Sequence, residues 1–265
     1  MTFEAYTCIR RDAQGREVAL RGRSIGPSAG RPIVMLASLG RPGSDFDEIA
    51  TCLAKTGYRV TLPEPRGIDG SSGPMEELTL HDLAADVAAV IESQCRPPVT
   101  LLGHAFGNRL TRMTAADYPA LVSRIVLLAC GGRIEIPEKA RDALVGCFNR
   151  DLSPEEHLEW VRYGFFAEGN DPAVWREGWH GEAMLMQSSA VRRTPVEEWW
   201  EAGGQPMLVV QATEDAIALP ANAHDLKARL GARVTLVELA HAGHAMLPEQ
   251  PERIVDIIQD YLAQT

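Results

Sequence analysis

Short apolar runs alternate with longer segments of helical periodicity along most of this chain, and this alternation restricts the fold more than any other feature. Parallel strands need long crossover connections, and these are usually helices. Six apolar runs have the length of buried strands, namely residues 33–37, 58–62, 99–102, 124–129, 207–210 and 234–239. The pattern therefore predicts an α/β fold with a mostly parallel twisted sheet and helices on both of its faces.

A hairpin and several helices are predicted around this parallel core. Residues 3–10 and 16–23 flank a turn that ends at Gly15, which favours an antiparallel hairpin at the start of the chain. Thr79 and Asp82 have the spacing of a capping box at the start of the clearest amphipathic pattern. Helices are expected over residues 80–93, 106–118 and 251–262, and residues 225–230 are expected to end a further helix at Gly231.

The strand pattern stops between residues 133 and 201, where short helical patterns separated by prolines replace it. We expect 133–201 to form a helical cap inserted into a core made of residues 1–132 and 202–265. Any single large side chain in this segment is explained well enough by the cap's own core. Aromatic and Met side chains also line apolar ligand pockets. As a cluster they predict a substrate-binding lid formed by Trp160, Trp175, Trp179, Trp199, Trp200, Phe165, Phe166 and Met184.

Charge and composition exclude several classes of partner. The formal net charge is -10 and no basic run is present, whereas nucleic-acid binding requires clustered Lys and Arg. No stretch reaches the roughly 18 uninterrupted apolar residues of a membrane helix. We therefore expect no nucleic-acid partner, no membrane partner, and a small apolar molecule as the ligand.

Residues 1–14 have no apolar core and contain two acidic residues, so they match neither a secretory signal nor a transit peptide. This predicts a cytoplasmic protein. The five cysteines are far apart and form no CxxC or Cys/His motif of metal-ligand spacing: Cys8, Cys52, Cys95, Cys130 and Cys147. We expect buried free thiols, no metal and no organic cofactor.

A strand, a tight turn and a helix are predicted around residues 103–107, which read Gly-His-Ala-Phe-Gly. In a nucleophile elbow of pattern G-x-S-x-G, the central residue occupies a strained turn and the glycines avoid Cβ clashes. The central residue here is Ala105, whose methyl group cannot attack a carbonyl carbon. The chain therefore has the sequence of a nucleophile elbow without its nucleophile.

The chain resembles the cap-bearing serine hydrolases of the α/β-hydrolase superfamily over nearly its whole length. Five motifs in the expected order carry the resemblance: Met35-Leu-Ala-Ser-Leu-Gly40, Pro63-Glu-Pro-Arg-Gly67 with Gly70-Ser71, the elbow, Val210-Gln-Ala-Thr-Glu-Asp215, and Ala242-Gly-His-Ala-Met-Leu-Pro-Glu-Gln-Pro251. The resemblance implies an α/β-hydrolase fold and a Ser-His-Asp mechanism. In that mechanism an imidazole takes the proton of a hydroxyl and a carboxylate orients the imidazole.

By this resemblance, Ala105 occupies the nucleophile position, Asp215 is the acidic partner and His244 is the base. Glu214 is the alternative to Asp215, and His241 is the alternative to His244. The place of Asp215 after a strand favours it over its neighbour. The helix start that follows His244 favours this histidine in the same way.

The resemblance also places two backbone donors for an oxyanion. One is the N–H of Phe106, the residue after the nucleophile position. The other is the N–H of Leu39 in the loop after the first parallel strand, with Gly40 as the alternative. His104, inside the elbow, is expected to give structural support.

Ala105 allows two explanations. Either the native protein has serine there and this chain carries a deliberate replacement, or alanine is native and the protein is no serine hydrolase. Retention of the glycines, the acid, the base and the oxyanion loop favours the first. The implied activity is hydrolysis of a small apolar ester, lactone or thioester through an acyl-enzyme. The alternative is a non-hydrolytic enzyme that uses the His-Asp pair as a base, or a ligand-binding module. Epoxide hydrolases and haloalkane dehalogenases are disfavoured because they need a carboxylate nucleophile.

Overall fold

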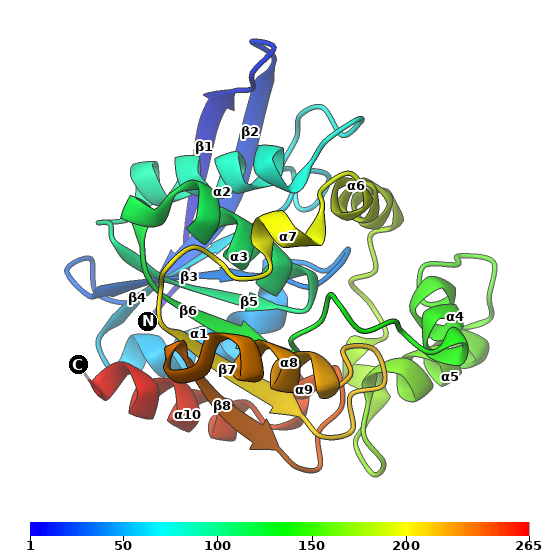
Figure 1. Ribbon diagram of the computed structural model, residues 1–265. Helices are drawn as coiled ribbons and strands as arrows, with labels where there is room; N and C mark the ends of the chain where they lie inside the picture. The colour runs from blue at the N-terminus through cyan, green and yellow to red at the C-terminus, as the bar shows by residue number, and fades with distance from the viewer. Residues whose placement is uncertain (265) are drawn as a thin grey trace.

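A central eight-stranded sheet organises the computed structural model, which describes residues 1–264 of the 265 (Figure 1). The strand order is β1-β2-β4-β3-β5-β6-β7-β8; β2 pairs antiparallel with β1 and β4, and all other pairs are parallel. This confirms the predicted hairpin and the predicted parallel sheet. The strands are β1 (Glu4–Arg11), β2 (Glu17–Ile25), β3 (Arg31–Leu36), β4 (Tyr58–Pro63), β5 (Val99–His104), β6 (Val122–Leu128), β7 (Met207–Ala212) and β8 (Val234–Leu239).

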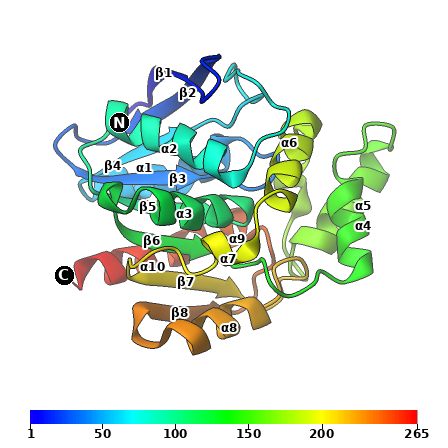
Figure 2. The ribbon, with the colours of Figure 1, turned by 45° about the horizontal axis from the view of Figure 1, so that its top comes forward.

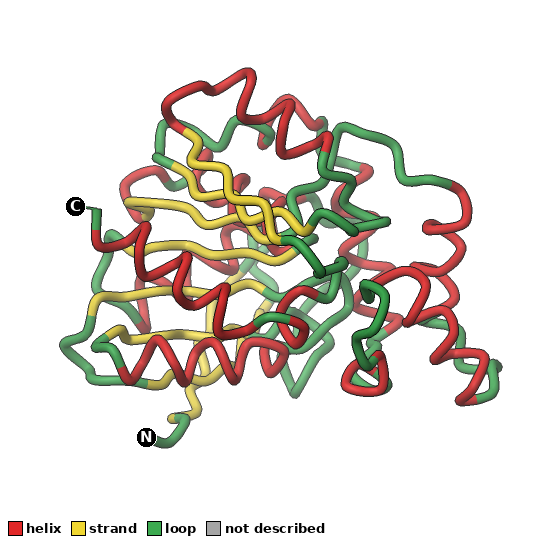
Figure 3. The backbone as a smooth tube through the Cα atoms, turned by 90° about the horizontal axis from the view of Figure 1, so that it is seen from below, coloured by secondary structure: helices red, strands yellow, loops and turns green. Residues whose placement is uncertain are grey.

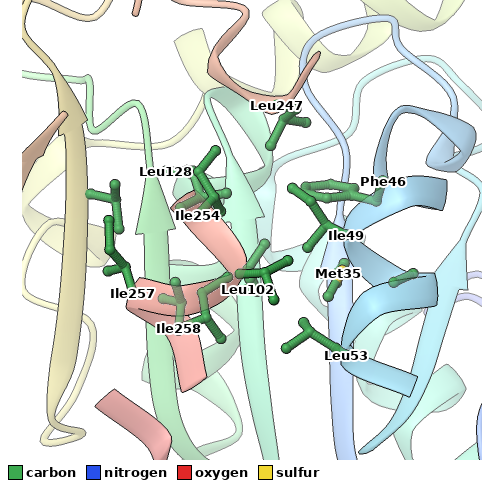
Figure 4. Packing of buried hydrophobic residues seen from close by; sticks show 14 of the residues in the cluster. Met35, Phe46, Ile49, Leu53, Leu102, Leu128, Leu247, Ile254, Ile257 and Ile258 are labelled. Atoms are coloured by element: carbon green, nitrogen blue, oxygen red, sulfur yellow. The ribbon is translucent and has the colours of Figure 1, made fainter. Parts of the chain in front are cut away.

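Helices cover both faces of the sheet. On one face α1 packs beside α10, and Figure 4 shows Ile49 and Leu53 of α1 with Ile254 and Ile258 of α10 in one apolar layer. On the other face α2, α3 and α8 bury a second layer. These helices are α1 (Asp47–Lys55), α2 (Leu80–Gln94), α3 (Phe106–Asp117), α8 (Ala221–Leu230), α9 (Met246–Glu249) and α10 (Pro251–Ala263).

The helices begin where the sequence supplies caps and end where it stops the periodicity. The Thr79 hydroxyl accepts the N–H of Asp82, and the Asp82 carboxylate accepts the N–H of Thr79, so the predicted capping box is formed. Helix α3 ends before Pro119, which lacks the N–H that a continuing helix would need. Helix α1 lies outside the predicted helices, whereas α8 ends at Leu230, before Gly231, as predicted.

Residues 133–201 contain helices and no strand in the described structure. Figure 2 shows that α4, α5 and α6 lie beyond the carboxyl ends of the parallel strands, and Figure 3 shows from below that helices and loops lie beyond one end of the sheet. Helix α7 instead packs against α3, because Trp199 and Trp200 belong to the apolar layer of the sheet. The elements of this segment are α4 (Glu138–Gly146), α5 (Pro154–Phe165), the 3-10 turn Pro172–Trp175, α6 (Gly181–Arg192) and α7 (Val196–Trp199).

No helix within residues 1–264 has the length and apolar character needed to cross a membrane. The same residues contain no group of three or more His, Cys, Asp or Glu side chains placed to hold a metal ion. All five cysteines are free thiols, and Cys8, Cys130 and Cys147 are buried. Cys52 and Cys95 are only partly buried, which the sequence did not predict.

Candidate active site

Ala105 lies at the sharp turn between β5 and α3. Its φ of 51° and ψ of -106° lie in a region that residues other than glycine rarely adopt. The Ala105 N–H donates to the carbonyl of Leu128 at 2.9 Å, and the Ala105 carbonyl accepts the N–H of Asn108 at 3.1 Å. These two hydrogen bonds hold the strained turn between the strand and the helix, as a nucleophile elbow requires.

The two glycines of the elbow are required by close backbone approach. A Cβ at Gly103 would lie 2.2 Å from the carbonyl carbon of Gly107, and a Cβ at Gly107 would lie 2.0 Å from the carbonyl oxygen of Leu36. Real Cβ atoms do not come this close to backbone atoms. The start of α3 can therefore approach β3 only because both positions lack a side chain.

His244 and Asp215 form a buried pair at the carboxyl edge of the sheet. Nδ1 of His244 lies 2.9 Å from Oδ2 and 3.0 Å from Oδ1 of Asp215, and both residues are 3% exposed. The carboxylate also accepts the N–H groups of Ile217 at 2.9 Å and Ala218 at 2.7 Å, which fix its orientation. Since a carboxylate only accepts, Nδ1 carries the imidazole proton and Nε2 is left as a base.

The two alternative residues lie outside this pair. Nδ1 of His241 is 4.0 Å from Oε1 of Glu214, and the His241 side chain is 94% exposed. Neither residue lines the cavity at Ala105. The contacts therefore pair His244 with Asp215 and leave His241 and Glu214 apart from the cavity.

His104 supports the base through its backbone. Nε2 of His104 donates to the carbonyl oxygen of His244 at 2.8 Å, and the His104 side chain is fully buried. Burial, with the nearby His244 ring, lowers the pKa of His104 to about 3. The imidazole is therefore neutral at physiological pH, and its second nitrogen, Nδ1, has no hydrogen-bond partner among the described residues.

Two backbone N–H groups beside Ala105 are free to bind an oxyanion. Leu39 and Phe106 both line the cavity, and neither N–H has a hydrogen-bond acceptor among residues 1–264. The N–H of Gly40 is occupied, because it donates to Oε1 of Gln187 at 2.7 Å. The structure therefore favours Leu39 over Gly40. Gln187 is a buried residue of α6 that no sequence motif indicated.

Two glutamates hold the loops of the site, the buried Glu64 and the partly buried Glu249, and no role was predicted for either from the sequence. Glu249 accepts the N–H of Gly243 at 2.6 Å and the N–H of Ala167 at 2.7 Å, which ties the loop before α9 to the inserted segment. Glu64 accepts the N–H of Gly43 at 2.8 Å. Burial raises the pKa of Glu249, and it raises the pKa of Glu64 to about 7.

A cavity of about 470 Å³ opens above Ala105 and His244. This volume is within the range of small-molecule sites. Its walls are mainly apolar, with side chains of Leu39, Ile134, Ile136, Leu144, Val191 and Ile217. Its polar side chains, apart from His244, are Ser38, Ser188, Arg109, Arg141 and Arg192.

The prediction that the aromatic cluster lines this cavity is wrong. Of the eight residues, none is among the described residues that line it: Trp160, Trp175, Trp179, Trp199, Trp200, Phe165, Phe166 and Met184. Three of them pack on one another inside the inserted segment, with ring centroids 5.1 to 6.1 Å apart for Phe165, Trp175 and Trp179. Phe165 also reaches the His244 ring, 5.5 Å away, from outside the cavity. Large aromatic rings bury a large apolar surface when they lie between packed helices, and these rings therefore lie between elements and not at the cavity wall.

Comparison with known proteins agrees with this architecture. A family model described as the alpha/beta hydrolase family matches residues 33–257. Protein ABHD8 of Bos taurus is 24% identical over 225 residues, which are 78% of this chain and 50% of that protein. The chain thus spans about half the length of these curated relatives.

Solved structures show the same fold at low sequence identity. A thermophilic esterase from Thermogutta terrifontis has a TM-score of 0.80 and 21% identity, covering 98% of each chain. The enol-lactonase from Burkholderia xenovorans LB400 has a TM-score of 0.79 and 20% identity, covering 97% of this chain and 100% of that one. Since the family model matches most of the sequence and the sheet, elbow and His-Asp pair fit it, this chain belongs to the alpha/beta hydrolase family.

Proposed function

We propose that this is the site of a hydrolase of carboxylic esters or related acyl compounds, such as lactones and thioesters, with alanine in place of the nucleophilic serine. The observation that carries the proposal is the complete set of partners around Ala105: a strained elbow, a buried base with its acid, and two free N–H donors. Structural neighbours that are an esterase and an enol-lactonase support the same class of chemistry.

The roles follow from the geometry. A serine at position 105 would pass its proton to Nε2 of His244 and attack the acyl carbon. Asp215 would stabilise the imidazolium, and the N–H groups of Leu39 and Phe106 would bind the oxyanion. His244 would then return the proton to the leaving group and activate water against the acyl-enzyme. Residues 133–201 would act as the cap that supplies the cavity's outer wall, through Ile134, Ile136 and Leu144 among others.

A second function is favoured by Ala105 itself. If alanine is native, His244 and Asp215 still form a buried base whose free nitrogen belongs to a cavity wall. Such a pair can remove a proton from a bound substrate without a covalent intermediate. This would be a non-hydrolytic reaction on the same fold.

The test compares three chains: the chain as given, Ala105→Ser, and Ala105→Ser with His244→Ala. Methyl and 4-nitrophenyl esters of graded acyl length, lactones and thioesters serve as substrates. We expect Ala105→Ser to raise turnover by at least about a thousandfold, because removing the serine of such a unit costs on the order of a million-fold. The His244→Ala change should abolish that gain, and a burst of released alcohol should report the acyl-enzyme.

His241→Ala in the Ala105→Ser background is the matched control, since His241 is exposed and outside the cavity. It should leave turnover unchanged. An Ala105→Ser variant that folds and is inert on all three substrate classes would overturn the hydrolase proposal. Hydrogen–deuterium exchange of a bound substrate that requires His244 but not serine would favour the second function.

A further inference from the structure

The cavity at Ala105 carries three arginines and no acidic side chain among its described lining residues. This is unexpected in a chain whose net charge is -10. Arg109 lies nearest to the chemistry along the chain, four residues after Ala105, so that both lie on one face of the start of α3. Arg141 and Arg192 come from α4 and α6 of the inserted segment.

Arg109 is a partly buried cation without a partner. Its guanidinium makes no hydrogen bond and no ion pair with any residue in the range 1–264, and it lies over the Trp199 ring, 5.9 Å from the centroid. Burial lowers the pKa of Arg109, yet a guanidinium titrates so far above neutrality that it stays charged. Desolvating such a charge without a counter-ion costs free energy.

The other buried arginines have their acceptors. Arg41 binds Asp45 at 2.8 Å, and Arg66 binds Asp86 at 2.7 Å. Arg112, one turn beyond Arg109, donates to backbone and side-chain oxygens at 2.7 to 3.3 Å. Each of these three buried guanidinium groups therefore donates to at least one acceptor in the protein, whereas the guanidinium of Arg109 donates to none among residues 1–264.

The two outer arginines differ from each other. Arg141 already binds Glu135 at 2.9 Å, in a pair that is largely exposed. Arg192 is exposed and has no ion pair or hydrogen bond among the described residues. The uncompensated positive charge of the cavity therefore comes from Arg109 inside and Arg192 at the rim.

We infer that Arg109, assisted by Arg192, binds a carboxylate on the substrate, so that the acyl compounds this site takes are anionic: half-esters of dicarboxylic acids or lactones that bear a carboxylate. This inference rests on the proposed function. A planar guanidinium matches a carboxylate with two parallel hydrogen bonds. The apolar wall formed by Ile134, Ile136 and Ile217 suits a short methylene chain between the carboxylate and the acyl carbon. An anionic substrate of this kind would differ from the small apolar ligand that the sequence predicts.

The first experiment needs no catalysis, so it stands even if the hydrolase proposal fails. Glutarate and its uncharged diamide are titrated into the chain as given, its Arg109→Gln variant and its Arg253→Gln variant by calorimetry. Arg253 is an exposed residue of α10 outside the cavity, so its loss makes the same charge change elsewhere. We expect glutarate to bind at least tenfold more tightly than the diamide, Arg109→Gln to remove that preference, and Arg253→Gln to keep it.

The second experiment measures specificity in the Ala105→Ser background. Monomethyl and dimethyl glutarate differ only in one charge, and the ratio of their kcat/KM values is compared with and without Arg109→Gln. We expect the monoester to be preferred about ten- to a hundredfold, and the preference to collapse in Arg109→Gln and recover in part in Arg109→Lys.

The outcomes separate the two proposals. Equal binding of glutarate and the diamide, or a preference indifferent to Arg109, overturns the anion inference whatever the catalysis. Hydrolysis of neutral esters without preference for the monoester overturns the inference and leaves the hydrolase proposal standing. Tight binding of inorganic phosphate without binding of glutarate would overturn the carboxylate proposal and indicate a phosphate-bearing substrate. Melting curves of each variant confirm that it is folded, which the lack of hydrogen bonds and ion pairs at Arg109 favours.

Discussion

His104 shows how a single buried side chain makes the stability of this site depend on pH. Its imidazole is fully buried and its pKa is lowered to about 3 from a usual 6.5. Between these values the unfolded chain binds a proton that the folded chain does not. A group of this kind contributes its full stability above the unfolded pKa and loses it as pH falls towards the folded pKa.

We compare the chain as given with His104→Gln, in which an amide nitrogen replaces Nε2 as donor to the His244 carbonyl, and expect their free energies of unfolding to depend differently on pH. As pH is lowered from about 6 to 4, the free energy of unfolding of the chain as given should decrease by an additional amount of about 1.4 kcal/mol per pH unit, because of this one proton. His104→Gln should lack that fall. Urea unfolding at several pH values measures it, and parallel slopes would show that His104 is not held neutral.

His81 supplies a control of opposite sign. Its burial opposes protonation, but the hydrogen bonds that its ring nitrogens donate to the Glu198 and Asp117 carboxylates, with the charges of these carboxylates, outweigh burial and raise its pKa. A raised pKa contributes stability below the unfolded value and loses it as pH rises through the folded one. His81→Gln should therefore steepen the loss of stability on acidification, where His104→Gln makes it shallower.

Among single residues, the sequence predicted those whose place in the folded structure follows from the strand that precedes them. Asp215 and His244 each follow a strand end, and strand ends of a parallel sheet meet at one edge. Arg109, Gln187 and Glu249 were missed because their significance depends on contacts between segments far apart in sequence. The one sequence signal for Arg109 is its spacing of one helical turn from Ala105, and it becomes informative only when the absence of a counter-ion is seen.

Among the elements, the contact of α3 with β3 sets the shape of the site. Gly107, the second residue of α3, faces the Leu36 carbonyl so closely that a Cβ would lie 2.0 Å from this oxygen. Gly107→Ala must therefore displace α3 or β3. We expect the free energy of unfolding to fall by about 3 kcal/mol, near the upper limit for overpacking.

Gly181→Ala is the matched change, because Gly181 begins α6 and a Cβ there would meet no atom within 4 Å. It should leave stability unchanged or raise it by up to about 1 kcal/mol, since alanine favours helix and restricts the unfolded chain. Equal effects of the two substitutions in chemical denaturation would contradict the close approach at Gly107.

Hydrophobic periodicity predicts only those helices that have a local signal in their own sequence. Helix α2 was predictable because its capping box and apolar stripe lie within one segment. Helix α1 is short and begins directly after a 3-10 turn, without a side-chain cap, so no local signal marks its start. Its position is determined instead by the packing of Ile49 and Leu53 against α10.

For the whole molecule, the tryptophans are the residues whose location the sequence predicted wrongly. A cluster of large aromatic residues in an inserted segment predicts a lid, because composition cannot tell a pocket wall from a helix interface. Helix α7 lies within the predicted cap of residues 133–201, yet its two tryptophans pack on the core. The Arg112 guanidinium lies 4.6 Å from the Trp199 ring centroid and 4.5 Å from that of Trp200.

Through this arrangement Trp200 packs the end of the inserted segment against the helices that cover the sheet. It is 1% exposed and belongs to the same apolar layer as α3, whereas Trp160 is partly buried against the inserted segment's own cluster. Trp200→Ala should lower the free energy of unfolding by about 3 to 5 kcal/mol, the cost of a large cavity in a core. It also exposes Arg112, whose Nη1 already lacks a partner among the described residues, to a void.

Trp160→Ala is the matched comparison, because it shows whether the packing of Trp200 contributes more to stability than packing inside the inserted segment. Because part of this ring already meets solvent, we expect it to cost less than Trp200→Ala by at least about 1 kcal/mol. Urea unfolding followed by far-ultraviolet circular dichroism measures both, independently of the lost tryptophan fluorescence. If Trp160→Ala proves the costlier change, α7 belongs with the inserted segment and the junction lies after it. If Trp200→Ala does, the junction lies before α7, and the inserted segment that lines the cavity ends with α6.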